Sequence, residues 1–135
     1  RPPTENYTVY KSSAASDVYK RQVDSRDPRL FHKTTQRKIY EAALSEAGDA
    51  DEVVLWNERG NVTECCTANL VIEKNGALVT PPVTCGLLPG TYRAFLVRRR
   101  VIGEAVISRE DLQKSPRIYL VNAVRKWRKA ELLPD

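Results

Sequence analysis

The sequence has few histidines and cysteines and no long apolar run, and each shortage excludes a class of protein. It contains one histidine and three cysteines in 135 residues, without a Cys-x-x-Cys pair, so no metal site is expected. No apolar run approaches the ~18 residues that cross a bilayer. The first residues also lack the apolar stretch of a secretion signal. We therefore expect a protein with no membrane partner.

The cysteines do not form the pattern of a disulfide-stabilised protein. Their number is odd, and Cys65 and Cys66 are adjacent, with Cys85 apart from them. Adjacent cysteines rarely bridge each other because their side chains diverge. We interpret all three as reduced thiols of a cytoplasmic protein, and Cys65 and Cys66 as structural residues.

Positive charge is in excess but is not gathered in one stripe. The formal net charge is +5, and the basic clusters at residues 98–100 and 125–129 have acidic residues between them. A basic module that binds nucleic acid remains an alternative. A solvated face or an anionic small-molecule substrate explains the charge as well, and we expect no nucleic-acid partner.

The chain divides into two segments of different character. Residues 1–22 show neither helical nor strand periodicity, and residues 12–22 (SSAASDVYKRQ) resemble a translated adaptor sequence. We expect this segment to be non-native or disordered, and in either case unpacked. Residues 23–135 read as one domain.

Within that domain, the pattern predicts hairpins separated by helices, which is typical of an α+β fold. An Asn75-Gly76 pair between two apolar runs indicates a two-residue hairpin turn. Ser108 and Asp111 have the spacing of a near capping box. The expected helices are 34–47, 91–99 and a short one after Ser108, and the expected strands are 53–56, one near 62, 68–73, 77–80, 104–107 and 117–121.

Four features could carry chemistry, and each has a plainer explanation. Lys33 follows apolar residues that could lower its pKa and free the amine as a nucleophile, although most lysines face solvent. Glu64 lies among small neighbours, where it could be buried beside a cation or could be a solvated strand-edge carboxylate. Residues 85–93 form a glycine-bounded loop that opens a helix, which suits a phosphate. Residues 122–125 follow a strand, where a ligand contact or an ordinary turn is expected.

Together these segments resemble a known family. Residues 31–37 (FHKTTQR), 51–64 (DEVVLWNERGNVTE) and 87–93 (LLPGTYR) are similar to segments of the class IV aminotransferases, and the resemblance covers residues 23–135. It implies the large C-terminal domain of that fold, a curved, mainly antiparallel sheet forming a pseudo-barrel with flanking helices. It also implies that a smaller N-terminal domain is missing, so we interpret the chain as a fragment.

The resemblance implies pyridoxal 5′-phosphate as the cofactor. Lys33 would bind it covalently and then move the substrate's proton, and Glu64 would pair with the pyridine nitrogen. The backbone N–H groups of Thr91 and Tyr92 would hold the phosphate. A threonine is common in the family where Tyr92 stands, so a hydroxyl contact there is not expected. Asn122 would line the phosphate or the substrate.

The remaining candidates and the reaction follow from the same resemblance. Arg93 and Ala123 are candidates for substrate binding, and Arg37 and Arg93 could instead be structural. Residues 33–35, 64–66 and 122–127 look most like the aminodeoxychorismate lyases, especially the form fused to the aminating subunit of aminodeoxychorismate synthase. That implies conversion of aminodeoxychorismate to 4-aminobenzoate and pyruvate in folate synthesis. Branched-chain and D-amino-acid aminotransferases are the alternative, and the family implies a homodimer.

Overall fold

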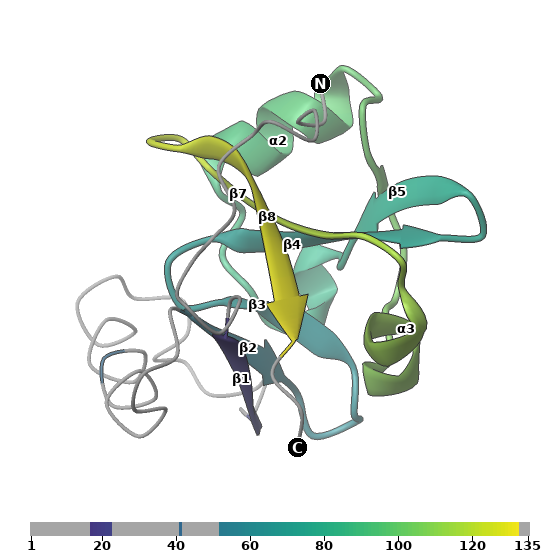
Figure 1. The fold of residues 1–135 in the computed structure, drawn as a ribbon. Helices are drawn as coiled ribbons and strands as arrows, with labels where there is room; N and C mark the ends of the chain where they lie inside the picture. The colour runs from purple at the N-terminus through teal and green to yellow at the C-terminus, as the bar shows by residue number, and fades with distance from the viewer. Residues whose placement is uncertain (1–16, 23–40, 42–51, 133–135) are drawn as a thin grey trace.

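The computed structural model describes residues 17–22, 41 and 52–132 of the chain. In this part the chain forms an eight-stranded sheet with helices α2 and α3 and the 3₁₀ helix η2 beside it (Figure 1). In chain order the elements are β1 (Asp17–Gln22), β2 (Glu52–Trp56), β3 (Val62–Cys65), β4 (Asn69–Lys74), β5 (Ala77–Thr80), η2 (Val83–Cys85), α2 (Thr91–Arg98), β6 (Gly103–Glu104), α3 (Arg109–Lys114), β7 (Ile118–Asn122) and β8 (Lys126–Leu132).

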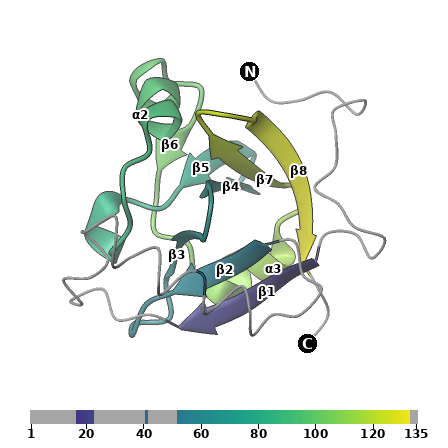
Figure 2. The same cartoon turned by 90° about the vertical axis from the view of Figure 1, so that its left-hand side faces the viewer.

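The sheet is mixed and strongly curved. Its strand order is β3-β2-β1-β8-β7-β4-β5-β6. The pairs β2–β3, β4–β5, β4–β7 and β7–β8 are antiparallel, and β1–β2, β1–β8 and β5–β6 are parallel. Figure 2 shows β8 linking the half that holds β1 and β2 to the half that holds β4, β5 and β7. The expected α+β fold is confirmed, with more parallel pairing than the sequence indicated.

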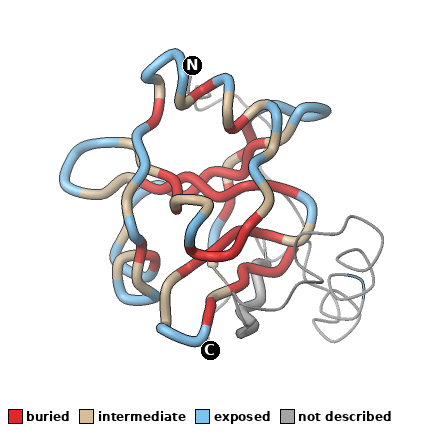
Figure 3. The backbone as a smooth tube through the Cα atoms, turned by 180° about the vertical axis from the view of Figure 1, so that it is seen from behind, coloured by how far each residue is buried: buried red, intermediate tan, exposed pale blue. Residues whose placement is uncertain are grey.

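The two faces of β4 divide the core into two clusters, as strand alternation requires. Leu70 and Ile72 face the interior between the halves of the sheet, where Leu112 of α3 joins them. Val71 points to the opposite face and packs in a second cluster with Leu96 of α2. Figure 3 shows the buried residues concentrated along these central strands. The helix α2 is thereby fixed on the outer face of β4 and β7.

Two local predictions are confirmed in detail. Asn75 and Gly76 have φ angles of 53° and 78°, as a hairpin turn with positive φ at both central positions requires. At the start of α3, the Ser108 hydroxyl accepts a hydrogen bond from the Asp111 amide, and the Asp111 carboxylate accepts one from the Ser108 amide, each at 3.0 Å. Both motifs depend on neighbours within three residues, which explains why the sequence predicts them.

Three expectations about strands need correction. Residues 17–22 were expected to be unpacked, but they form β1 between β2 and β8. The strand expected at 104–107 is the short β6, which pairs with β5 over two residues. No strand was expected at the basic cluster 125–129, but it leads into β8, where Trp127 is buried. The strands β1 and β6 pair with β2 and β5, partners at least 24 residues away in the sequence, whereas β8 also forms a hairpin with β7, which ends four positions before it. Residues 1–16 and most of the helix expected at 34–47 lie outside the described part of the chain.

Candidate functional site

Glu64 is a buried carboxylate in the middle of the candidate site. It lies on β3, and 5% of its surface is exposed. One carboxylate oxygen accepts a hydrogen bond from the Leu88 amide at 3.3 Å, and the other accepts one from the Asn69 side-chain amide at 3.4 Å. A carboxylate in such a place needs donors because water no longer solvates it. Of the two alternatives for Glu64, the structure therefore favours burial over a solvated strand edge.

The loop before α2 lies against Glu64 and Asn69. Gly86 takes a left-handed conformation with φ at 101°, and Leu87 next to it is fully buried. A Cβ atom on Gly90 would lie 2.4 Å from the side-chain oxygen of Asn69. Gly90 therefore has no room for a side chain, and the backbone approaches Asn69 closely.

In the described part of the chain, no side chain caps the backbone N–H groups at the start of α2. Gly90 is its N-cap residue and, having no side chain, provides no capping hydrogen bond. The first N–H groups of a helix lack intrahelical partners and carry its positive dipole end. Thr91 is exposed, whereas the Tyr92 ring stacks on Phe95 and lies under the Lys126 ammonium. Binding of a phosphate by the backbone N–H groups of Thr91 and Tyr92 remains a prediction.

Asn122 ends β7, and its side chain organises the turn into β8. Its amide nitrogen donates to the Thr67 carbonyl at 3.1 Å. Its amide oxygen accepts from the Val124 and Arg125 amides at 3.1 and 2.7 Å. Ala123, the other candidate here, is exposed within the turn. These contacts show Asn122 connecting two turns, and its contact with a ligand remains a prediction.

Arg93 points into the fold. It is 4% exposed, and its guanidinium donates to the Pro81 carbonyl at 2.9 Å and pairs with the Glu104 carboxylate. The sequence was compatible with two roles for this residue, a structural one and the binding of a substrate carboxylate. The contacts favour the structural role, because Arg93 ties α2 to the end of β5 and to β6.

Glu52 is a second buried carboxylate, which the sequence-based candidates did not include. It is fully buried at the start of β2. It accepts hydrogen bonds from the amides of Val53, Cys66 and Thr67 at 2.8–3.0 Å and from the Thr67 hydroxyl. Burial, the largest effect, raises the pKa of Glu52 above its ordinary value, although these hydrogen bonds oppose the shift. An acidic residue directly before an apolar strand was the available signal.

The adjacent cysteines belong to the turn that Glu52 holds. Cys65 is buried, and burial followed by the charge of Glu52 raises the pKa of its thiol well above the ordinary value. A thiol in this state is a poor nucleophile because little thiolate forms. The amide of Cys66 donates to Glu52 at 2.8 Å. Both observations support a structural role.

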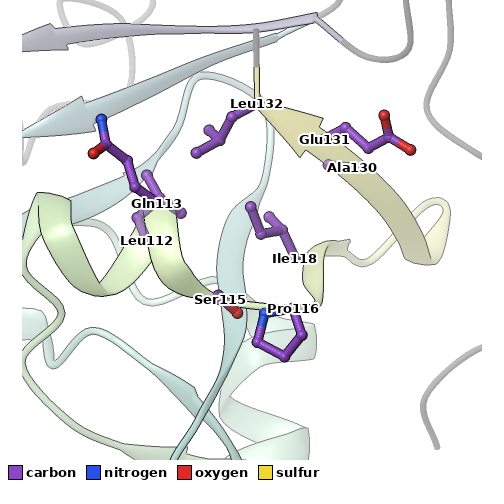
Figure 4. A pocket seen from close by; sticks show the side chains of 8 residues that line it. All are labelled: Leu112, Gln113, Ser115, Pro116, Ile118, Ala130, Glu131 and Leu132. Carbon is purple, nitrogen blue, oxygen red and sulfur yellow. The ribbon is translucent and has the colours of Figure 1, made fainter. Parts of the chain in front are cut away.

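The structure thus brings together Glu64, the loop at 86–90 and the start of α2, with Asn69 between them. Lys33 and Arg37 lie outside the described residues. A cavity of about 180 Å³ is found elsewhere, between α3 and the end of β8 (Figure 4). None of the candidate residues lines it; its walls are Leu112, Gln113, Ser115, Pro116, Ile118, Ala130, Glu131 and Leu132.

Comparison with known proteins decides the family. The model of the amino-transferase class IV family matches residues 3–132. The chain belongs to the class IV aminotransferase family. The match also spans β1 and thus includes part of the segment that was expected to be foreign to the fold.

Individual relatives of this class IV aminotransferase chain carry two kinds of name. A protein of Schizosaccharomyces pombe named "Putative aminodeoxychorismate lyase" is 31% identical over 115 residues, which are 80% of this chain and 50% of that protein. A Mesorhizobium loti structure named "Putative amino-acid aminotransferase" has a TM-score of 0.78 and 34% identity over 94% of this chain and 64% of that one. The chain therefore spans about half to two thirds of these relatives' lengths.

More distant structures share the fold. The Legionella pneumophila structure named "Putative 4-amino-4-deoxychorismate lyase" has a TM-score of 0.65 and 25% identity, covering 98% of this chain and 52% of that one. The branched-chain amino acid aminotransferase of Escherichia coli has a TM-score of 0.72 at 18% identity, covering 90% and 45%. At this identity the likeness concerns the fold alone.

Among the described residues, no helix has the length and apolar character needed to span a membrane.

Proposed function

We propose that the full-length protein is a pyridoxal-phosphate enzyme that cleaves 4-amino-4-deoxychorismate to 4-aminobenzoate and pyruvate. The observation that carries this proposal is the 31% identity with the S. pombe lyase-like protein, within a family that the chain shares. The described site supports the cofactor part of the proposal through two features.

The first feature is the start of α2, which fits a phosphate group. Gly90 leaves the helix without a side-chain cap. A larger residue at that position would bring its Cβ atom into collision with the Asn69 side-chain oxygen. The amides of Thr91 and Tyr92 would donate to phosphate oxygens there, and the helix dipole favours the negative charge. Tyr92 would contribute through its backbone, since its ring packs against Phe95.

The second feature is the buried carboxylate of Glu64, which fits a pyridine nitrogen. In a site shielded from water, a carboxylate favours the protonated form of a nearby nitrogen base. When bound, pyridoxal phosphate supplies an electron sink for the charge that develops on the substrate carbon. Glu64 would maintain that capacity by holding a proton on the ring nitrogen.

Lys33 would complete the chemistry. In the resting protein its amine would hold the cofactor covalently. Once the substrate amine had displaced it, the freed lysine amine would remove the proton from the substrate carbon that bears the amino group. In the lyase reaction the substrate ring would then become aromatic as pyruvate leaves. We further propose that the full-length protein is a homodimer with a small-molecule substrate, as the family resemblance implies.

An aminotransferase is the second candidate, and a specific observation favours it. The M. loti structure is 34% identical over 94% of this chain, which is a slightly higher identity over a longer stretch than that of the lyase-like relative. In this alternative the same residues would return the proton to the cofactor instead of releasing pyruvate.

An assay of the full-length protein separates the two reactions. The protein is incubated with aminodeoxychorismate and no amino acceptor, and pyruvate and 4-aminobenzoate are measured. Equal amounts of both products would support the lyase. No product here, together with amino transfer from a branched-chain or D-amino acid to 2-oxoglutarate, would establish the aminotransferase instead.

A further inference from the structure

Asn69 makes contacts that no proposed role has yet used. It is the first residue of β4 and is 6% exposed. Its side-chain nitrogen donates to the Glu64 carboxylate at 3.4 Å and to the Leu88 carbonyl at 3.2 Å. The two hydrogens of one amide group are thus divided between the carboxylate and the loop that precedes α2.

These bonds close a small ring of contacts. Leu88 accepts from Asn69 through its carbonyl and donates to Glu64 through its amide at 3.3 Å. The oxygen of the Asn69 side chain lies against Gly90, and a Cβ atom on Gly90 would be only 2.4 Å from this oxygen. Asn69 therefore touches both the carboxylate and the residue that caps α2.

Only three residues connect β3 to β4, but in the described sheet no strand pairing joins β3 to β4 or to the loop before α2. In the strand order, β3 is an edge strand and is separated from β4 by β2, β1, β8 and β7. In the connection between β3 and β4, the Cys65 amide donates a backbone hydrogen bond to the Ala68 carbonyl at 2.8 Å. The loop before α2 pairs with neither strand in the described ladders. Hydrogen bonds of side chains link Glu64 to the loop instead: the Leu88 amide donates to Glu64 directly, and the Asn69 amide bridges Glu64 and the Leu88 carbonyl.

We propose that Asn69 is a positioning residue that sets the distance between the Glu64 carboxylate and the start of α2. The inference rests on the proposed function, in which these two parts bind the ring nitrogen and the phosphate of one rigid cofactor. The span between those two groups varies little because the ring is planar and the phosphate arm is short. A protein that binds both ends must hold its two contact points at a fixed separation, and Asn69 supports the direct bond between Glu64 and Leu88 by binding both residues.

The test measures the affinity of the full-length protein for pyridoxal phosphate by absorbance titration. Asn69→Ala should raise the dissociation constant about 10- to 100-fold, as expected when a hydrogen bond to a charged group is lost and the loop is released. Asn69→Asp keeps the shape but removes the donor, and it should weaken binding at least as much, because it places a second carboxylate beside Glu64.

Asn57 supplies a matched control. It is also a buried asparagine, and its amide nitrogen donates to a backbone carbonyl, that of Cys85 at the end of η2, at 3.0 Å. None of its hydrogen bonds involves Glu64 or Leu88. Asn57→Ala and Asn57→Asp should change the dissociation constant less than about threefold, since they leave the contacts among Glu64, Asn69 and Leu88 in place.

A double-mutant cycle separates positioning from general structural damage. If Asn69 acts through Glu64, then Asn69→Ala should weaken binding less in a Glu64→Gln background than in the unmodified protein. Additive effects, or Asn69 variants that bind as tightly as the Asn57 variants, would overturn the inference.

The same experiments distinguish failure of the inference from failure of the proposed function. If the unmodified protein does not bind pyridoxal phosphate, both fail. If Glu64→Gln alters neither the affinity nor the spectrum of the bound cofactor, the role of Glu64 fails, and the role of Asn69 with it. If Glu64→Gln has its effect and Asn69→Ala has none, the inference alone is overturned.

Discussion

Two buried carboxylates, Glu52 on β2 and Glu64 on β3, are held in different ways. Glu52 is fully buried and receives short hydrogen bonds from three backbone amides, two of which belong to the turn after β3. Glu64 is 5% exposed, and its hydrogen bonds with the Leu88 amide and the Asn69 side chain are longer, at 3.3 and 3.4 Å. Burial and residue type are nearly the same, so the partners distinguish the roles. Glu52 organises a turn, whereas Glu64 faces the loop that precedes α2.

The largest expected effect is on catalysis at Glu64. Glu64→Gln in the full-length protein should reduce turnover about 10²- to 10³-fold, the usual cost of losing an electrostatic partner in a dry site. A neutral amide keeps the size of the side chain but cannot hold a proton on the ring nitrogen. Steady-state kinetics give the result, and thermal unfolding should show a smaller loss of stability than any substitution that removes Glu52.

The next effect is on stability at Glu52. Glu52→Ala should lower the free energy of unfolding by about 3 kcal/mol, because it leaves the amides of Cys66 and Thr67 without their acceptor. Glu110→Ala is the control, since that carboxylate is 71% exposed and pairs with Lys114; it should cost less than about 1 kcal/mol. Urea denaturation measures both. If the two variants are equally stable, Glu52 does not organise the turn.

The pH dependence of stability sharpens the same comparison. Burial raises the pKa of Glu52 above its ordinary value of 4.5 in the folded protein. Its contribution to stability is therefore fully present below pH 4.5 and is lost as the pH rises through the folded pKa. Glu52→Gln does not titrate, so the unmodified protein should lose stability relative to this variant as the pH rises above 4.5. An increase over the same range, in urea denaturation at several pH values, would contradict the raised pKa.

The smallest effect is expected in the region of α3. Ser108→Ala removes the hydroxyl that caps α3 and should cost about 1 kcal/mol of stability. Affinity for pyridoxal phosphate should not change, because none of the contacts described around Glu64 comes from α3. Ser108→Thr keeps an acceptor and serves as the control. A loss of cofactor affinity in Ser108→Ala would mean that the two regions are coupled.

The sequence predicts those features that depend on near neighbours. The turn at Asn75 and Gly76, the cap formed by Ser108 and Asp111, and the helix start at Thr91 each follow from residues a few positions apart. The sequence left the burial of Glu64 open, and composition alone favoured an exposed carboxylate.

The missed features depend on contacts between distant residues. Glu52 binds amides 14 and 15 positions later in the chain, and Asn69 binds a carbonyl 19 positions later. The strands β1 and β8 pair with each other across more than a hundred residues. No local pattern encodes these partners, so they become visible when the chain is folded.

The central claim is that this chain carries a pyridoxal-phosphate site whose covalent attachment point is Lys33. The direct test is borohydride reduction of the unmodified full-length protein with its cofactor, followed by protease digestion and mass spectrometry of the peptides. We expect the reduced pyridoxyl group on the peptide that contains Lys33. The group on Lys38, Lys74 or another lysine would contradict the assignment of Lys33, and its absence from every peptide would contradict the cofactor itself.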